Sequence, residues 1–286
     1  MDLTNINEIK TLLSRHGFRF SKSKGQNFLT AAWVPEDIAY AAGLDGQTGV
    51  LEIGPGIGCL TEQLSERAGK VVSVELDTAL RPVLAETLAG RNNVEIVYGD
   101  ALKLNIPKLL DEKMPGMRHV VCANLPYNVT GPVISKLLKC RCFDSVTVMI
   151  QREVARRICA RPGTGEYGEF TVFVNWYARP EMLFDVPPDC FIPQPKVTSS
   201  VIRLDCRVSP PVEVKSEAMF MRVVRAAFAQ RRKTLLNALS TGFGELSKDE
   251  VEKCLLDSGF DPKVRGEVLS IGEFAKIADA FFAVLD

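Results

Sequence analysis

Four consecutive residues, Asn124-Leu125-Pro126-Tyr127, combine a carboxamide, a restrained backbone and an aromatic ring. The amino group of a nucleobase is a poor nucleophile because its lone pair is delocalised into the ring. A site that accepts both amino hydrogens, through the Asn124 carboxamide oxygen and a backbone carbonyl, can turn that lone pair toward an incoming methyl group. Pro126 fixes its own φ, and Tyr127 offers a stacking face. The motif suits methylation of a planar amine, although an isolated sequence of this kind is more often a turn after a strand.

A glycine-rich segment follows the apolar run at residues 49–53. Gly54, Gly56 and Gly58 are closely set, and such glycines let the backbone approach a ligand that a Cβ would push away. The spacing departs from the dinucleotide-binding fingerprint, whose third glycine would stand at Cys59. The segment therefore disfavours NAD and leaves room for a nucleoside that lacks a pyrophosphate.

Acidic residues follow the next two strand-like runs. Glu75 can accept hydrogen bonds from both ribose hydroxyls, and Asp100 can accept one from an adenine amino group. An acid at a strand end is more often a helix cap or part of a solvated turn. Because ligands of open α/β sheets bind at the carboxyl ends of the strands, however, the glycines, Glu75, Asp100 and Asn124 trace one ligand across four successive strand ends. This pattern predicts an S-adenosylmethionine site.

Short apolar runs alternate with helical patterns through the first two thirds of the chain. This alternation predicts a parallel sheet covered by helices on both faces, in the Rossmann-like manner of class I methyltransferases. The last two runs are joined without an obvious helix, so an antiparallel hairpin is possible there. The expected strands are residues 49–53, 70–74, 94–97, 119–123, 146–150, 170–174 and 197–204.

The character of the chain changes after Pro210 and Pro211. Residues 216–240, 247–259 and 270–284 have helical periodicity. We therefore expect two domains, a methyltransferase domain at residues 1–207 and a smaller all-helical domain at residues 208–286 that contacts RNA or the ribosome.

The formal net charge is zero, but the charges are unevenly distributed. Residues 136–161 carry seven basic side chains against two acidic ones, and residues 222–233 carry five basic and no acidic ones. Such clusters are usually solvated helix surface, yet two of them can present a basic face to phosphates. The predicted phosphate contacts are Arg152, Arg156, Arg157, Arg222, Arg225, Arg231, Arg232 and Lys233.

The eight cysteines include no Cys-x-x-Cys pair, so we expect reduced, packed thiols and neither a metal site nor a disulfide framework. No apolar run approaches the roughly 18–20 residues of a membrane span, and the N-terminus lacks the layout of a secretory signal. We expect a cytoplasmic protein without a membrane segment or metal.

The sequence resembles the small-subunit ribosomal RNA adenine N6-dimethyltransferases. Beyond the motifs above, the resemblance covers most of the chain and extends to residues 25–29, 165–168, 191–197 and 228–235. It implies transfer of methyl groups from S-adenosylmethionine to the N6 amino groups of two adjacent adenosines near the 3′ end of the small-subunit RNA, during small-subunit biogenesis. The partner implied is the small ribosomal subunit with its RNA, and nothing suggests an obligate dimer, so we expect a monomer.

The resemblance also assigns roles to residues. It implies that Asn27 and Leu29 close over the methionine end of the cofactor. The catalytic set becomes Asn124, Leu125 and Tyr127 with Phe191, which would stack on the target base from the side opposite Tyr127. The prolines flanking Phe191 favour an exposed loop there.

The sequence leaves alternative functions open. One is a ribosome-assembly or transcription-associated factor that binds RNA or DNA and methylates only secondarily; the intact Asn124, Tyr127 and Glu75 argue against it. Others are methyltransferases acting on adenine of 23S ribosomal RNA or of DNA. The branch of the resembling family that modifies large-subunit RNA typically carries Asn-Ile-Pro-Phe, whereas this chain has Tyr127.

Overall fold

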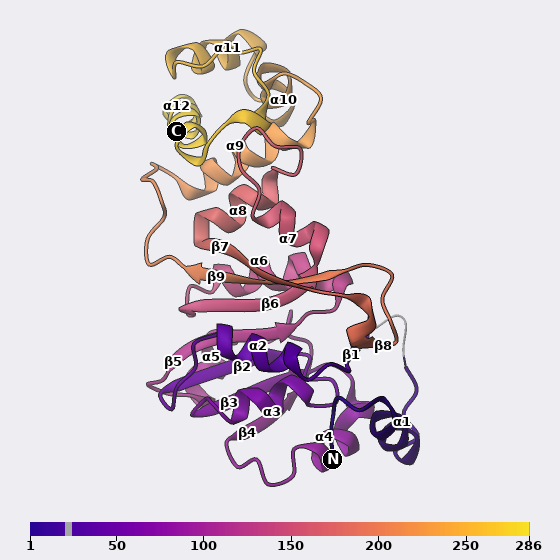
Figure 1. Ribbon diagram of the computed structural model, residues 1–286. Coiled ribbons are helices and arrows are strands. Elements are labelled where there is room, and N and C mark those ends of the chain that lie inside the picture. Colours follow the sequence, from indigo (N-terminus) through magenta and orange to yellow (C-terminus); the bar gives the residue numbers. More distant parts are fainter. Residues whose placement is uncertain (21–24, 286) are drawn as a thin grey trace. The chain divides into compact units, whose positions relative to one another are not determined.

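The computed structural model describes residues 1–20 and 25–285, which form two compact units (Figure 1). Unit 1 comprises Met1–Ala155 and Ala178–Cys206, and unit 2 comprises Arg156–Tyr177 and Arg207–Asp286. The chain passes from unit 1 to unit 2 for the second time between Cys206 and Arg207, next to the domain boundary expected at residues 207/208. The segment at residues 156–177, which we expected in the first domain, groups instead with the C-terminal helices.

Unit 1 is built on a seven-stranded sheet of order β4-β3-β2-β5-β6-β9-β7. The first five strands in this order are mutually parallel, and β9 runs antiparallel to both β6 and β7. The strands are β2 (Thr48–Ile53), β3 (Lys70–Glu75), β4 (Val94–Tyr98), β5 (Arg118–Asn124), β6 (Ser145–Gln151), β7 (Ala178–Val186) and β9 (Ser199–Cys206). A separate antiparallel pair joins β1 (Phe28–Leu29) to β8 (Phe191–Ile192).

Helices cover the sheet because its central strands are apolar on both faces. Successive strand residues point to opposite faces, and Val50 and Leu51 are both fully buried, as are Val71 and Val72. The helices of this unit are α1 (Ile6–Arg15), α2 (Trp33–Ala41), α3 (Cys59–Ser65), α4 (Arg81–Thr87), α5 (Ile106–Lys113) and α6 (Thr130–Lys139), with α7 (Arg152–Ile158) beginning in unit 1 and ending in unit 2. The alternation read from the sequence therefore predicted the class of fold correctly.

One predicted strand is wrong. Residues 170–174 lie in helix α8 (Glu169–Tyr177), and the strand that pairs with β9 is β7, which begins at Ala178. A short continuous apolar run is compatible with either a buried strand or a buried helix. The true strand was hidden because it carries Pro180 and charged residues, which an edge position tolerates.

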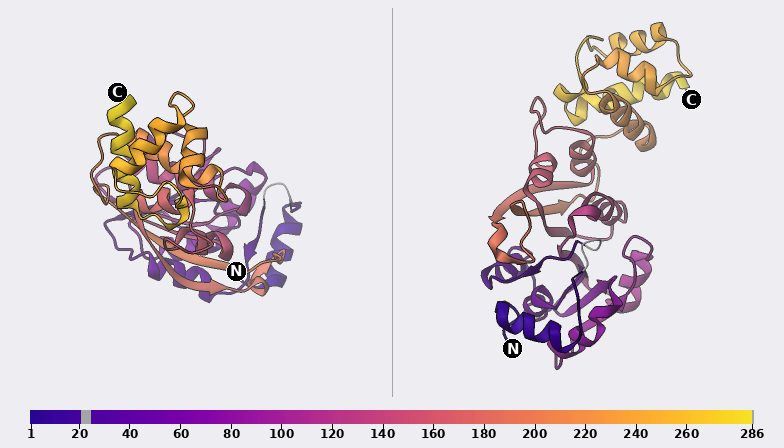
Figure 2. Two further views of the ribbon diagram at one scale, coloured as in Figure 1. Left: turned by 90° about the horizontal axis from the view of Figure 1, so that it is seen from above. Right: turned by 90° about the vertical axis from the view of Figure 1, so that its right-hand side faces the viewer.

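Unit 2 is all-helical, and its helices pack into a bundle, coloured orange and yellow at the C-terminal end (Figure 2). It contains α8, α9 (Glu217–Ala229), α10 (Leu235–Gly242), α11 (Lys248–Asp257) and α12 (Ile271–Leu285). The expected helix at residues 216–240 is interrupted between α9 and α10; the other two are confirmed. The Trp176 ring stacks on Phe220 with centroids 4.1 Å apart, and the Tyr167 hydroxyl donates to the Leu269 carbonyl oxygen at 2.8 Å. These contacts explain why residues 156–177 belong to this unit.

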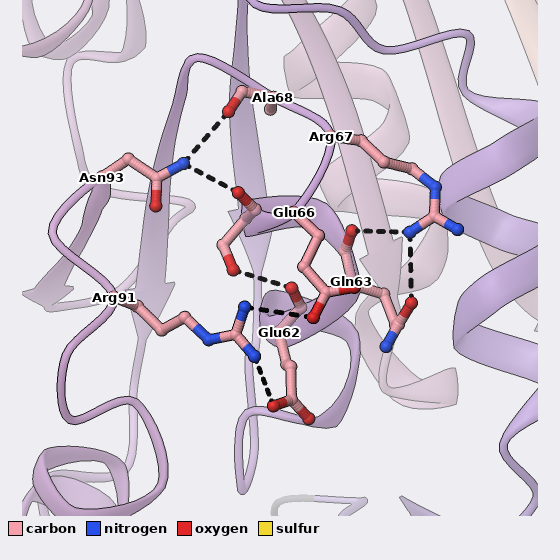
Figure 3. A network of polar contacts seen from close by, with 8 residues as sticks. Glu62, Gln63, Glu66, Arg67, Ala68, Arg91 and Asn93 are labelled. Carbon is pink, nitrogen blue, oxygen red and sulfur yellow. Dashed lines mark hydrogen bonds and ion pairs between the residues drawn. The ribbon is translucent and has the colours of Figure 1, made fainter.

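Polar contacts tie α3, which follows the glycine segment, to the loop before β4 (Figure 3). The Arg91 guanidinium donates to Glu62 and Glu66, at 2.5 and 3.1 Å. Asn93 Nδ2 donates to the carbonyl oxygens of Ser65 and Ala68, at 2.9 and 3.0 Å. The network holds the end of α3 against its neighbouring loop.

Candidate cofactor and methyl-transfer site

A pocket in unit 1 lies at the carboxyl ends of β2, β3, β4 and β5, with β1 contributing one wall. It brings together every residue predicted from the sequence to bind the cofactor, although these residues span almost one hundred positions of the chain. They are Asn27, Leu29, Gly54, Gly56, Glu75, Asp100 and Asn124, and Leu125 and Tyr127 also line the pocket. The strand-end argument therefore located the pocket.

The glycine segment needs its glycines for conformation and for space. Gly54, Gly56 and Gly58 have φ values of 74°, 60° and 95°, in the region that side chains rarely adopt. A Cβ on Gly56 would also come within 3.1 Å of the Phe28 ring. The backbone therefore forms the pocket floor at this point.

Glu75 is fixed at the end of β3 by main-chain donors. Its carboxylate accepts the N–H of Gly56 at 3.3 Å and the N–H of Asp77 at 2.6 Å. Asp77 in turn accepts a hydrogen bond from Gln26 Nε2 at 2.8 Å. The side chain is 6% exposed, so these contacts orient a largely buried carboxylate toward the pocket.

Asp100 follows β4 and makes local contacts. Its Oδ1 accepts the N–H of Leu102 at 2.9 Å, and its Oδ2 lies 3.9 Å from the Nζ of Lys103. The Lys103 side chain is 85% exposed, so this ion pair contributes little. Asp100 therefore both closes a turn and lines the pocket.

Asn124, the last residue of β5, is oriented by the β1 segment. Its Nδ2 donates to the carbonyl oxygen of Asn27 at 3.1 Å, and Asn27 Nδ2 donates to the carbonyl oxygen of Gly25 at 3.2 Å. Among the described residues, none donates to the Asn124 carboxamide oxygen. The carboxamide is thus held in one orientation with its acceptor still available.

The rest of the motif is anchored to neighbouring strands. Leu125 is 1% exposed, and its N–H donates to the carbonyl oxygen of Met149 on β6 at 3.1 Å. Since its side chain is buried, any part that Leu125 plays at the reacting centre belongs to its backbone.

Tyr127 is tethered at its hydroxyl, which is 2.7 Å from the Oγ of Ser199 on β9. Ser199 is fully buried, and burial raises the pKa of Tyr127 above its usual value. The tether fixes the ring that lines the pocket. Sequence reasoning did not single out Ser199, although it lies in the expected strand at residues 197–204.

The prediction of an exposed loop around Phe191 is wrong. Phe191 is 4% exposed and belongs to the hydrophobic core, where β8 pairs with β1 so that Phe191 lies opposite Leu29. The N–H of Thr30 also donates to the carbonyl oxygen of Cys190, which folds this segment onto β1. Prolines indicated a loop, but apolar side chains on both segments drew it into the core. A stacking role for Phe191 stays a prediction.

Glu52 is a pocket residue to which sequence reasoning assigned no role. It is fully enclosed at the end of β2, and its Oε2 accepts the hydroxyls of Thr61 and Ser73 at 2.7 and 2.6 Å. Its Oε1 is buried without a hydrogen-bond partner among the described residues. Burial raises the pKa of Glu52 to about 7, and the Glu75 charge adds to the rise. The sequence signal that could have identified Glu52 is its position as an acidic residue inside the otherwise apolar run at residues 49–53.

Several of the eight predicted phosphate contacts also make internal contacts. Arg222 stacks over the Phe243 ring at 4.1 Å and pairs with Glu245 at 2.6 Å, and Arg231 donates to the carbonyl oxygens of Gly165 and Tyr167. These two arginines brace unit 2. Arg225 lies 3.6 Å from Glu169, and Arg152, in unit 1, lies 3.5 Å from Asp185. Six of the eight are exposed, and only Arg152 and Arg222 are half-buried.

Metal clusters and membrane-spanning helices are both absent from the part of the chain that the structure describes. No group of three or more His, Cys, Asp or Glu side chains there is arranged to hold a metal ion. No helix within residues 1–20 and 25–285 is long and apolar enough to cross a membrane.

The sheet order and the pocket at its strand ends define a Rossmann-like methyltransferase of class I. Residues 17–281 match the family described as ribosomal RNA adenine dimethylase, and the chain belongs to this family. A protein of Geobacillus thermodenitrificans named ribosomal RNA small subunit methyltransferase A is 47% identical over 283 residues, 98% of this chain and 97% of that protein. A protein of Clostridium botulinum with the same name is 47% identical over 277 residues, 96% of this chain and 99% of that protein.

Two solved structures are similar to most of this chain. A dimethyladenosine transferase from Plasmodium falciparum superposes with a TM-score of 0.73 at 26% identity, covering 87% of this chain and 95% of that one. The 23S rRNA methyltransferase ErmE superposes with a TM-score of 0.67 at 27% identity, covering 89% of this chain and 99% of that one.

The buried Glu52 predicts an unusual dependence of stability on pH. Between its unfolded value of 4.5 and its folded value of about 7, the folded state holds a proton that the unfolded state has lost. The free energy of unfolding should therefore fall by up to roughly 3 kcal/mol as pH rises through this window, and stay lowered above it. Glu52→Gln should remove this part of the pH dependence, measured by urea denaturation from pH 4.5 to 8.

The matched control is Glu36→Gln, which changes an exposed glutamate on α2 and should leave the profile of the unmodified protein. A Glu52→Gln profile parallel to that of the unmodified protein would show that Glu52 ionises normally in the folded state.

Proposed function

We propose that this protein transfers methyl groups from S-adenosylmethionine to the N6 amino groups of two adjacent adenosines near the 3′ end of small-subunit ribosomal RNA, as a step in small-subunit biogenesis. The observation that carries the proposal is the Asn124 carboxamide, held by the Asn27 carbonyl with its own oxygen available at the pocket. Membership of the ribosomal RNA adenine dimethylase family supports it, as do relatives named for the small subunit.

The residues around the pocket suit S-adenosylmethionine. Glu75 would accept the ribose hydroxyls, Asp100 the adenine amino group, and the backbone at Gly54 and Gly56 would lie against the nucleoside. Asn27 and Leu29 would cover the methionine end. The buried, unpartnered Oε1 of Glu52 supplies a further polar atom at the pocket wall. When bound, the cofactor supplies an electrophilic methyl group on a sulfonium.

The remaining residues would orient the base. The Asn124 carboxamide oxygen and the backbone of the motif accept the two N6 hydrogens, which turns the nitrogen lone pair toward the methyl group. Stacking on Tyr127, whose ring is fixed through Ser199, holds the base and contributes on the order of 1–3 kcal/mol. Since nitrogen loses a proton readily once it carries positive charge, the site needs no general base before transfer. Positioning provides most of the acceleration, for which roughly 7–11 kcal/mol is attainable.

A second candidate substrate is large-subunit RNA, because the chain is also similar to ErmE. The higher identity to relatives named for the small subunit favours the first. We further propose that the protein acts as a monomer on small subunits in the cytoplasm, without a metal.

Substrate choice can be tested with S-adenosylmethionine labelled in its methyl group. We expect label in under-methylated small subunits, and two N6-dimethyladenosines per RNA near its 3′ end after nuclease digestion and chromatography. Large subunits, their naked RNA and duplex DNA are tested in parallel as alternative substrates. If none of the substrates is labelled, the proposed methyltransferase activity is refuted. If only large-subunit RNA or duplex DNA is labelled, that nucleic acid is the substrate instead.

Asn124→Ala should separate binding from catalysis. Loss of the carboxamide removes the acceptor for N6, so turnover should fall by at least about 100-fold, as when one preorganised hydrogen-bonding group is lost. Calorimetry should still detect cofactor binding, because Glu75, Asp100 and the glycine segment remain. Asn128→Ala, an exposed asparagine in the same loop, is the control and should retain activity. Unchanged turnover of Asn124→Ala would remove Asn124 from the catalytic set.

The exposed basic residues of unit 2 should contact phosphates. Replacing Arg232 and Lys233 together by alanine should weaken binding to small-subunit RNA, and should reduce the slope of log affinity against log salt by about 1 for each phosphate that is no longer neutralised. Filter binding at several salt concentrations measures both. Lys253→Ala, an exposed lysine on α11, is the control. An unaltered salt slope would exclude the pair from the RNA interface.

A further inference from the structure

A tight turn between α6 and β6 carries two cysteines separated by one residue. Cys140 is the C-cap residue of α6, and Arg141 follows with a φ of 50°, the one positive φ of a non-glycine residue in the described part of the chain. Residues i and i+2 are already near in sequence, and a left-handed residue between them turns the chain back on itself. The thiol of Cys142 consequently donates a hydrogen bond to the sulfur of Cys140.

The surroundings of this turn activate one of its two sulfurs. The hydrogen bond from Cys142 lowers the pKa of Cys140 to about 7, with Lys136 adding to the effect and partial burial opposing it. The Lys136 ammonium is held in place because it donates to the carbonyl oxygens of Leu102 and Leu104, at 2.7 and 2.6 Å. Donating the hydrogen bond to Cys140 raises the pKa of Cys142, and burial raises it further.

The other cysteines lack this combination. The described residues include all eight, and burial raises the pKa of Cys59 and Cys206 to about 12 and that of Cys159 to about 11. Cys140 and Cys142 are both free and only half-buried, so small reagents can reach them. Cys206 contributes to the raised pKa of Cys142 and is therefore a competing thiol to test.

We propose that Cys140 and Cys142 form a redox-active dithiol, which hydroperoxides oxidise to an intramolecular disulfide. The Cys140 thiolate attacks one peroxide oxygen, the O–O bond breaks, and the leaving oxygen takes a proton, so that a sulfenic acid and water (or an alcohol) form. The Cys142 sulfur then attacks the Cys140 sulfur. An S–S bond forms, the S–O bond breaks, and hydroxide leaves with the Cys142 proton as water. Two thiols are oxidised and one peroxide is reduced.

The dithiol is separate from the proposed methyl-transfer site. Helix α6 begins at Thr130, three residues after Tyr127, and Cys140 follows its other end. Ten helical residues span about 15 Å, so the dithiol can be altered without touching the pocket residues. Its chemistry can therefore be tested whatever the outcome of the methylation assay.

The first test uses the unmodified reduced protein, so that no variant has to fold. Because the pKa of Cys140 is lowered whereas that of Cys159 is raised, Cys140 should react with iodoacetamide at pH 7 on the order of ten-fold faster than Cys159. One equivalent of hydrogen peroxide should lower the intact mass by two hydrogens and protect Cys140 and Cys142 from alkylation. Trypsin cleaves after Arg141, so the disulfide should appear as a crosslink between two tryptic peptides.

Variants identify the two sulfurs. Cys142→Ser should leave a sulfenic acid on Cys140 that dimedone traps, and Cys140→Ser should abolish peroxide-dependent crosslinking. Cys206→Ser is the matched control and should form the same disulfide as the unmodified protein. The proposal is overturned if Cys140 reacts no faster than Cys159, if peroxide leaves both thiols alkylatable, or if the crosslink joins Cys140 or Cys142 to Cys206 instead.

Discussion

The parallel arrangement of β2, β3, β4 and β5 is the constraint on which the site depends. Parallel neighbours end at the same edge of a sheet, so residues separated by twenty or more positions in sequence come together there. Helices on both faces keep these strands buried and their registers fixed. Glu52, Glu75 and Asn124 are therefore placed by backbone hydrogen bonding of the sheet, and each needs few further contacts to become oriented.

Two glutamates at adjacent strand ends differ because their surroundings differ. Glu75 accepts two main-chain N–H groups, which fix the orientation of its carboxylate. Glu52 receives two hydroxyls on one oxygen and is completely enclosed, so burial outweighs those hydrogen bonds and the proton is retained to higher pH. A single small region thus contains a carboxylate oriented by main-chain donors and a buried carboxyl group with a raised pKa.

Much of the site was predictable from sequence, since strand ends and glycines have local signatures. Glu75, Asp100 and Asn124 each follow an apolar run, and the pocket contains all three. The errors share a cause. Residues 170–174 are apolar enough for a strand but pack as a helix, and Phe191 stands between prolines yet lies in the core. In each case contacts with distant segments, such as Trp176 with Phe220 or Phe191 with Leu29, overrode the local signal.

The sequence by itself determined the class of fold, the order of the motifs and the kind of chemistry, because these follow from local hydrophobic pattern and residue type. Only the tertiary structure decided which side chains are held and which are available. It showed that Arg222 and Arg231 make internal contacts and that Ser199 fixes Tyr127. The physical reason is that burial, hydrogen-bond partners and pKa depend on atoms from remote parts of the chain, and a linear pattern contains no record of those distances.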